Sequence, residues 1–130
     1  MLIKANPKNG DQLSILGFGC MRFPLKGGGI DEERSTKMIR DAIENGVNYF
    51  DTAYFYHNGK SEALLGNALT GGYREKVKIA TKLPPFMVSK LEGAKKILAN
   101  QISKLKTDYI DYYLLHMLTD KATLDRKSVV

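Results

Sequence analysis

Four short apolar segments, beginning near residues 15, 47, 77 and 110, constrain the fold of this chain more than any other feature. They recur at intervals of roughly 30 residues, the length of one strand–helix–strand unit, and each gap contains a helical pattern. A helix between two strands carries the chain back, so that the next strand runs in the same direction as the first. The repeat therefore predicts an α/β fold with a parallel sheet.

The predicted strands cover residues 14–19, 47–50, 77–81 and 109–115. The first predicted helix begins near Asp31, whose side chain can cap it, and ends at Asn45-Gly46. The second covers residues 61–69, and the third follows a capping-box pattern formed by Ser89 and Glu92. Periodicity predicts the buried faces of the first and third helices: Met38, Ile39, Ala42 and Ile43, and then Leu91, Ala94, Leu98, Ile102 and Leu105.

Three further segments lie outside this repeat. Residues 2–4 and 12–14 flank an Asn-Gly turn signal and are predicted to form a short β-hairpin. Residues 24–29 are rich in glycine and are predicted to be a loose loop. Residues 117–130 could begin another helix but have no apolar face to complete one.

Two architectures repeat strands and helices in this way, the doubly wound dinucleotide-binding sheet and the eight-fold TIM barrel. The first requires Gly-x-Gly-x-x-Gly between its first strand and a helix, but residues 17–22 read GFGCMR and no helix follows at once. The sequence therefore predicts four βα units of a TIM (β/α)8 barrel, preceded by a short β-hairpin, in one domain that covers residues 1–130. We expect a half-barrel, because a complete barrel commonly takes about 250 residues.

Polar residues follow three of the predicted strands at the point where each strand ends. Asp51, Lys82 and His116 each come after an apolar run, and Tyr56 lies on the loop that follows Asp51. The carboxyl ends of barrel strands hold the active site, and neighbouring strands lie about 4.8 Å apart. We therefore expect these four side chains to lie within hydrogen-bonding range of one another.

A phenol, an ammonium, a carboxylate and an imidazole together suit the protonation of a carbonyl oxygen. A tyrosine hydroxyl is ordinarily a weak acid at neutral pH, and a nearby ammonium favours its ionised form. A carboxylate can hold the ammonium, and an imidazole can orient the carbonyl. Hydride must come from a cofactor, because no side chain supplies it.

Four motifs in this sequence resemble those of the aldo-keto reductase family, in the family's order and spacing. They are NYFDTAYFY at residues 48–56, SEALLG at 61–66, IATK at 79–82 and DYIDYYLLH at 108–116. The resemblance extends to about residue 120 and implies the amino-terminal half of that family's barrel. It also implies roles in catalysis: Tyr56 as the general acid, Lys82 as the group that makes it more acidic, Asp51 as the partner of Lys82, and His116 as the group that orients the carbonyl.

The resemblance further implies an NADP(H) cofactor and a small carbonyl substrate. In the family, residues in the positions of Met21, Arg22 and Asp51 lie near the nicotinamide and its ribose, but strands five to eight supply most cofactor contacts and this chain has no counterpart to them. Residues 19–24, GCMRFP, are similar to a branch whose members often carry a cysteine-rich iron–sulfur extension, which this sequence does not contain.

Composition and charge limit the kinds of partner that the chain is expected to bind. The chain has 20 lysines and arginines against 14 acidic residues, a net charge of +6, with a mild lysine cluster on the third predicted helix. This spread favours a solvated helix face over a nucleic-acid patch.

No apolar run approaches the ~20 residues of a membrane helix, and the first residues show no signal-peptide core, so we expect a cytoplasmic protein. Cys20 is the one cysteine, which excludes an internal disulfide, and neither it nor His57 shows metal-ligand spacing, so no metal site is expected.

Three hypotheses for the chain's role remain open. It is a carbonyl reductase that works when a complete barrel is assembled, a half-barrel that persists as an inactive homodimer, or a truncated gene product without a function of its own. The second follows from the two open edges of a half-barrel sheet, which expose apolar surface and unpaired backbone groups.

Overall fold

The computed structural model describes residues 1–121 and contains a four-stranded parallel sheet. Its strands are β3 (Phe18–Gly19), β6 (Tyr49–Asp51), β7 (Lys78–Leu83) and β8 (Tyr112–Leu115), in that order across the sheet. All three strand pairs are parallel, which confirms the prediction of an α/β fold built from successive βα units.

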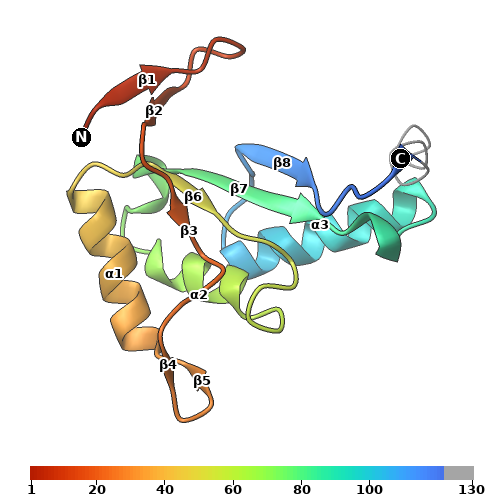
Figure 1. Ribbon diagram of the computed structural model, residues 1–130. Helices are drawn as coiled ribbons and strands as arrows, with labels where there is room; N and C mark the ends of the chain where they lie inside the picture. Colours follow the sequence, from red (N-terminus) through yellow and green to blue (C-terminus); the bar gives the residue numbers. More distant parts are fainter. Residues whose placement is uncertain (122–130) are drawn as a thin grey trace.

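Three helices lie on one side of this sheet, as Figure 1 shows. They are α1 (Glu32–Glu44), α2 (Ser61–Ala68) and α3 (Leu91–Leu105). Successive side chains of a strand point to opposite faces, so alternate strand residues face these helices. Phe50 and Ile79 do so in the main core, and Leu83 does so in a smaller cluster with Val88 and Ala94. The other face of the sheet carries no helix within residues 1–121.

Helix α1 begins as its sequence predicts, whereas α3 does not. The Asp31 carboxylate accepts a hydrogen bond from the Arg34 backbone N–H, and Gly46 follows the helix with a φ of 90°. Helix α3 has Lys90 as its N-cap residue and no side chain capping it, so the predicted Ser89–Glu92 capping box is wrong. Its other end is closed by Lys106 in the left-handed conformation.

Periodicity predicts the buried faces of α1 and α3 in part, since Ile39, Ile43, Ala94 and Leu105 are buried as expected. Met38 and Leu91 are 40% and 47% exposed, and Ser35 and Gln101 are fully buried. Periodicity identifies an apolar stripe but not which neighbours cover it. Leu91 is the first residue of α3, and Gln101 is buried because α2, β7 and β8 supply hydrogen-bond partners to its side chain.

The first predicted strand is shorter than expected. Only Phe18 and Gly19 pair with β6, and Ile15 and Leu16 are 63% and 58% exposed. Ser14 belongs instead to the predicted N-terminal hairpin, formed by β1 (Ile3–Ala5) and β2 (Gln12–Ser14).

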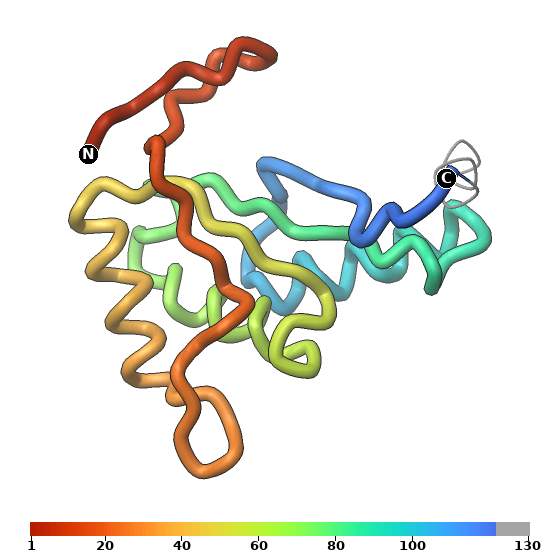
Figure 2. The backbone as a smooth tube through the Cα atoms, viewed as in Figure 1, coloured from red at the N-terminus to blue at the C-terminus, as the bar shows by residue number. Residues whose placement is uncertain are grey.

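A second hairpin occupies the segment that the sequence predicts as a loose loop. Strands β4 (Leu25–Lys26) and β5 (Gly29–Ile30) pair across Gly27 and Gly28, which have φ values of 60° and 81°. A two-residue turn with both φ values positive matches the twist of the flanking strands and requires residues such as glycine. Figure 2 shows the two hairpins projecting at opposite sides of the molecule, the first in red and the second in orange.

A buried ion pair closes the end of the sheet where β7 and β8 begin. Arg74, on the short helix η1 (Arg74–Lys76), contacts the Asp111 carboxylate at 2.9 Å, and both side chains are buried. The guanidinium also donates to the Tyr109 carbonyl and lies 4.0 Å from the centre of the Tyr109 ring. Asp111 in turn accepts the Ile79 backbone N–H. The pair is thus fully hydrogen-bonded, as a buried charge requires.

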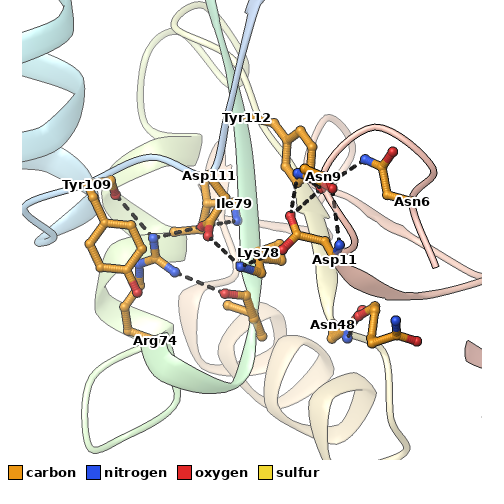
Figure 3. Close-up of polar contacts among 12 residues, drawn as sticks. Asn6, Asn9, Asp11, Asn48, Arg74, Lys78, Ile79, Tyr109, Asp111 and Tyr112 are labelled. Carbon is orange, nitrogen blue, oxygen red and sulfur yellow. Dashed lines mark hydrogen bonds and ion pairs between the residues drawn. The ribbon is translucent and has the colours of Figure 1, made fainter. Parts of the chain in front are cut away.

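The N-terminal hairpin is tied to this same end of the sheet through Asp11. Its carboxylate accepts the Tyr112 hydroxyl at 2.6 Å and contacts the Lys78 ammonium at 3.2 Å. Lys78 also contacts Asp111 at 3.3 Å, which joins the two sets of charges. Figure 3 shows the resulting basal cluster, defined as Asp11, Arg74, Lys78, Asp111 and Tyr112.

The close packing of α2 on α3 yields a first prediction. A β-carbon added at Gly66 would lie 2.5 Å from the Lys104 carbonyl oxygen and 2.7 Å from the Leu105 carbonyl carbon. Both are backbone atoms, so the helices must separate. We expect Gly66→Ala to lower the free energy of unfolding by about 1–3 kcal/mol, measured by urea denaturation.

Gly29→Ala is the matched control, because nothing lies within 4 Å of a β-carbon at that position. Its unfolding free energy should stay within about 0.5 kcal/mol of the unchanged chain. Equal losses in the two variants would show that the packing of α2 on α3 does not limit stability.

Candidate active site

The register of the parallel strands places Asp51, Lys82 and His116 on the sheet face opposite the helices. Asp51 pairs with Ala80, two residues before Lys82, and Lys82 pairs with Leu114, two residues before His116. Steps of two residues keep a side chain on the same face. The three residues therefore rise in a diagonal row across the ends of β6, β7 and β8.

The Lys82 ammonium is the centre of this row. It donates to the Asp51 carboxylate at 2.6 Å, to the Thr52 carbonyl at 2.8 Å and to the Tyr56 hydroxyl at 3.1 Å. An ammonium has three protons, so these three oxygens use its full donor capacity. The Lys82 side chain is 13% exposed and that of Asp51 is 33% exposed, so the pair is partly shielded from water.

Tyr56 is held on its loop by contacts on both sides. Its backbone carbonyl accepts the N–H groups of Gly59 and Ser61, at the start of α2. The next residue, His57, has a φ of 53°, and its Nε2 accepts the Phe23 backbone N–H at 2.9 Å. His57 thus ties the loop to the segment after β3. The Tyr56 hydroxyl accepts from Lys82, and within residues 1–121 no acceptor takes its own proton.

The structure brings Tyr56, and not Tyr54, to Lys82. The Tyr54 ring instead packs edge-on against Phe55, and its centre lies 4.6 Å from the Lys104 ammonium. Sequence reasoning without the family spacing could not distinguish the two tyrosines. The structure places the Tyr56 hydroxyl at Lys82, and the role of Tyr56 as the general acid stays a prediction.

His116 completes the group beside Tyr56. The two rings meet edge to face with their centres 5.8 Å apart, and the His116 backbone N–H donates to the Leu83 carbonyl. Burial lowers the pKa of His116, and the nearby Lys82 charge lowers it further, against a smaller opposite effect of Asp51. A neutral imidazole at neutral pH has one N–H donor and one acceptor nitrogen. Its Nδ1 is buried and has no hydrogen-bond partner in the described part of the chain.

The predicted cofactor residues Met21 and Arg22 lie directly after β3, at the same end of the sheet as Lys82, and both are exposed. Their neighbour Cys20 is fully buried, and its backbone N–H donates to the Asp51 carbonyl. Burial raises the pKa of the Cys20 thiol, and the Asp51 charge adds to this effect. The thiol therefore stays protonated and packs as part of the hydrophobic core. No group of three or more metal-binding side chains gathers within residues 1–121.

Sequence reasoning missed the polar residues behind the sheet. Glu62, Thr81 and Gln101 are fully buried, and their side chains are hydrogen-bonded to one another. The one available signal was Gln101, a polar residue next to Ile102 on a face expected to be apolar. It was not strong enough to predict a polar cluster.

Comparison with known proteins shows the family of the chain. Residues 15–125 match the family model described as "Aldo/keto reductase family". The chain belongs to the aldo/keto reductase family. It is 32% identical over 122 residues to the uncharacterized oxidoreductase YqkF of Bacillus subtilis, a match covering 87% of this chain and 38% of YqkF. It is 42% identical over 88 residues to methylglyoxal reductase YeaE of Escherichia coli, covering 65% of this chain and 30% of YeaE.

The fold of this aldo/keto reductase chain matches solved members of the family. An aldo/keto reductase of Klebsiella pneumoniae, solved with NADP and acetate, superposes with a TM-score of 0.76 at 25% identity. The match covers 92% of this chain and 42% of the Klebsiella chain. The prediction of half of this family's barrel is therefore confirmed. The chain spans well under half the length of these relatives. No helix in residues 1–121 is long and apolar enough to cross a membrane.

The charges around His116 give a second prediction. Lys82→Met removes a charge that lowers the pKa of His116, so that pKa should rise toward its ordinary value. Asp51→Asn removes a charge that raises it, so the pKa should fall further. NMR titration of the imidazole measures both shifts. Since burial is the largest cause, neither variant restores the ordinary value.

Lys95→Met is the matched control, because Lys95 is exposed on α3 and is not among the causes of the shift. The same lowered pKa makes stability fall as the pH drops below the ordinary value of about 6.5, since the unfolded chain takes up the proton first. For the pKa of His116, shifts of the same sign in Lys82→Met and Asp51→Asn would contradict the assigned effects of these two charges.

Proposed function

We propose that this chain carries the proton-donating side of an NADP(H)-dependent reductase of small carbonyl compounds. The observation that supports this most is the Lys82 ammonium, which bridges the Asp51 carboxylate and the Tyr56 hydroxyl. Three comparisons also support the proposal. The chain belongs to the aldo/keto reductase family, one relative is methylglyoxal reductase YeaE, and another was solved with NADP.

Each of the four residues has a role in the proposed reaction. A carbonyl group would lie beside Tyr56, with an N–H of neutral His116 donating to its oxygen. When bound, a nicotinamide cofactor would supply the hydride that the carbonyl carbon receives and would itself be oxidised. The Tyr56 O–H bond breaks as its proton moves to the carbonyl oxygen, which gives an alcohol and leaves a phenolate. Lys82 stabilises that phenolate, and Asp51 keeps the ammonium in place.

The residues of this chain are suited to hold one part of NADP(H), the nicotinamide and its ribose. The Tyr56 hydroxyl lies at the same end of the sheet as exposed Met21 and Arg22, and within residues 1–121 no protein acceptor takes its proton. Asp51 retains a partly exposed carboxylate there. We propose that Met21, Arg22 and Asp51 lie near the nicotinamide and its ribose. The resemblance assigns the remaining contacts to strands five to eight, so these residues alone should bind NADP(H) weakly.

The third prediction tests the role of Tyr56. Tyr56→Phe should lower the rate of NADPH oxidation with methylglyoxal by at least about 100-fold, the usual contribution of a general acid. NADPH affinity, followed by nicotinamide fluorescence, should change little. Tyr54→Phe is the matched control and should retain the rate, because Tyr54 does not contact Lys82.

Two results would count against the proposal. The first is a flat fluorescence titration of the unchanged chain up to millimolar NADPH. The second is equal turnover in the Tyr56→Phe and Tyr54→Phe variants.

A second candidate is an assembly unit in which two copies cover each other's open sheet edges. Strand β8 has a free edge in the four-stranded sheet, and Leu114 on it is 41% exposed. On the side of β7 and β8 that faces α3, a groove has a volume of about 250 Å³ and is lined mainly by apolar residues: Leu83, Leu91, Ala94, Lys95, Leu98, Tyr113 and Leu115. Exposed apolar surface joined to a free strand edge favours association.

The fourth prediction concerns this association. Sedimentation of the purified chain should show a homodimer, and Leu114→Lys should shift it toward monomer by placing a charge on the apolar edge. Leu2→Lys makes the same change at an exposed position before β1 and should leave the dimer intact. A stable monomeric form of the unchanged chain would exclude the assembly unit.

A further inference from the structure

The core between the sheet and α2 and α3 contains a charged carboxylate where apolar packing is expected. Glu62, on α2, is fully buried. Its Oε1 accepts the Thr81 hydroxyl at 2.6 Å and the Gln101 amide at 2.8 Å. Burying a carboxylate is costly, and well-packed apolar residues in its place are often at least as stable. Fold stability alone therefore does not account for this group.

Gln101, on α3, connects β7, which carries Lys82, with β8, which leads to His116. Its Nε2 donates to the Lys82 carbonyl at 3.0 Å as well as to Glu62. Its Oε1 accepts the hydroxyl of Tyr113, on β8, at 2.7 Å. Burial, with a contribution from the Glu62 charge, raises the pKa of Tyr113 to about 12, so that hydroxyl keeps the proton it donates. The carboxylate and the carbonyl are acceptors only, which fixes the orientation of the amide.

Lys104, one turn further along α3, extends the same group toward the Tyr56 loop. Its ammonium lies 3.9 Å from Glu62 Oε2, an oxygen without a hydrogen-bond partner in the described residues. The same ammonium lies 4.6 Å from the centre of the Tyr54 ring. Tyr54 is two residues before Tyr56. The carboxylate thus faces β7 through one oxygen and the Lys104–Tyr54 contact through the other.

We propose that Glu62, Gln101 and Lys104 are positioning residues that align Lys82 with Tyr56 and His116 from behind the sheet. Gln101 fixes the backbone of Lys82 relative to β8, which leads to His116. Lys104 supports the loop that presents the Tyr56 hydroxyl. Glu62 holds Gln101 and Lys104 in register on α3. That this alignment serves catalysis rests on the proposed reductase function. That these residues hold Lys82 in place does not depend on it.

The test follows the Lys82 ammonium directly, in the full chain labelled with ¹⁵N at its lysine side chains. Loss of one signal in Lys82→Arg assigns the resonance. Gln101→Met keeps the volume of the side chain and removes its hydrogen bonds. We expect proton exchange of the Lys82 ammonium with water to become roughly tenfold faster in this variant, as expected when a hydrogen bond of ordinary strength is lost.

Asp111→Ala is the control for stability. It breaks the buried pair with Arg74 at the opposite end of the sheet and leaves the contacts of Lys82 untouched. Exchange at Lys82 should stay as in the unchanged chain, although unfolding occurs at lower denaturant. Unchanged exchange in Gln101→Met, or equal acceleration in Asp111→Ala, would overturn the proposal.

Turnover provides a separate readout. In a chain that reduces methylglyoxal, Gln101→Met should lower kcat roughly tenfold or more and change KM little, because misplacement of a catalytic group affects the chemical step. A chain without turnover would contradict the reductase function, while the exchange measurement would still decide whether the three residues position Lys82.

Discussion

The three hydrogen bonds of the Lys82 ammonium set a strict condition on the fold. Their acceptors come from the end of β6 and from the loop after it, while Lys82 itself comes from β7. The contacts form only because the two strands are parallel, adjacent and in a register that pairs Asp51 with Ala80. A slip of one residue would turn Lys82 toward the helices and leave its charge in an apolar core.

The two ends of the sheet serve different purposes. The basal cluster holds the ends where β7 and β8 begin, through the buried pair of Arg74 and Asp111 and through Asp11 of the N-terminal hairpin. The opposite ends carry the polar group around Lys82. Barrels of this kind place their chemistry at the carboxyl ends of the strands. Within residues 1–121 the ion pairs of the basal cluster and the ion pair of Lys82 share no residue, so stability and the proposed chemistry can be tested separately.

The strands and helices could largely be predicted from the sequence, because they depend on local order along the chain. A polar residue after an apolar run marks a strand end, and on that basis Asp51, Lys82 and His116 were expected at one end of the sheet, where the structure places them. Their catalytic roles stay predictions. Errors arose where burial depends on distant neighbours. Leu91 follows the helical period but lies at the margin of α3, while Gln101 is buried because its partners come from α2, β7 and β8. No local pattern contains that information.

The charge balance of the site explains why a neutral histidine belongs beside Lys82. The charges of Lys82 and Asp51 compensate each other. A protonated His116 would add a second positive charge beside Tyr56, with the Asp51 carboxylate left to compensate both cations. Burial and the Lys82 charge lower the pKa of His116, which removes that competition at neutral pH. The group then contains one compensated ion pair, a phenol whose proton is not used internally, and an imidazole with a free N–H. Such a set can donate two hydrogen bonds to one neutral oxygen, which is the requirement for polarising a carbonyl group.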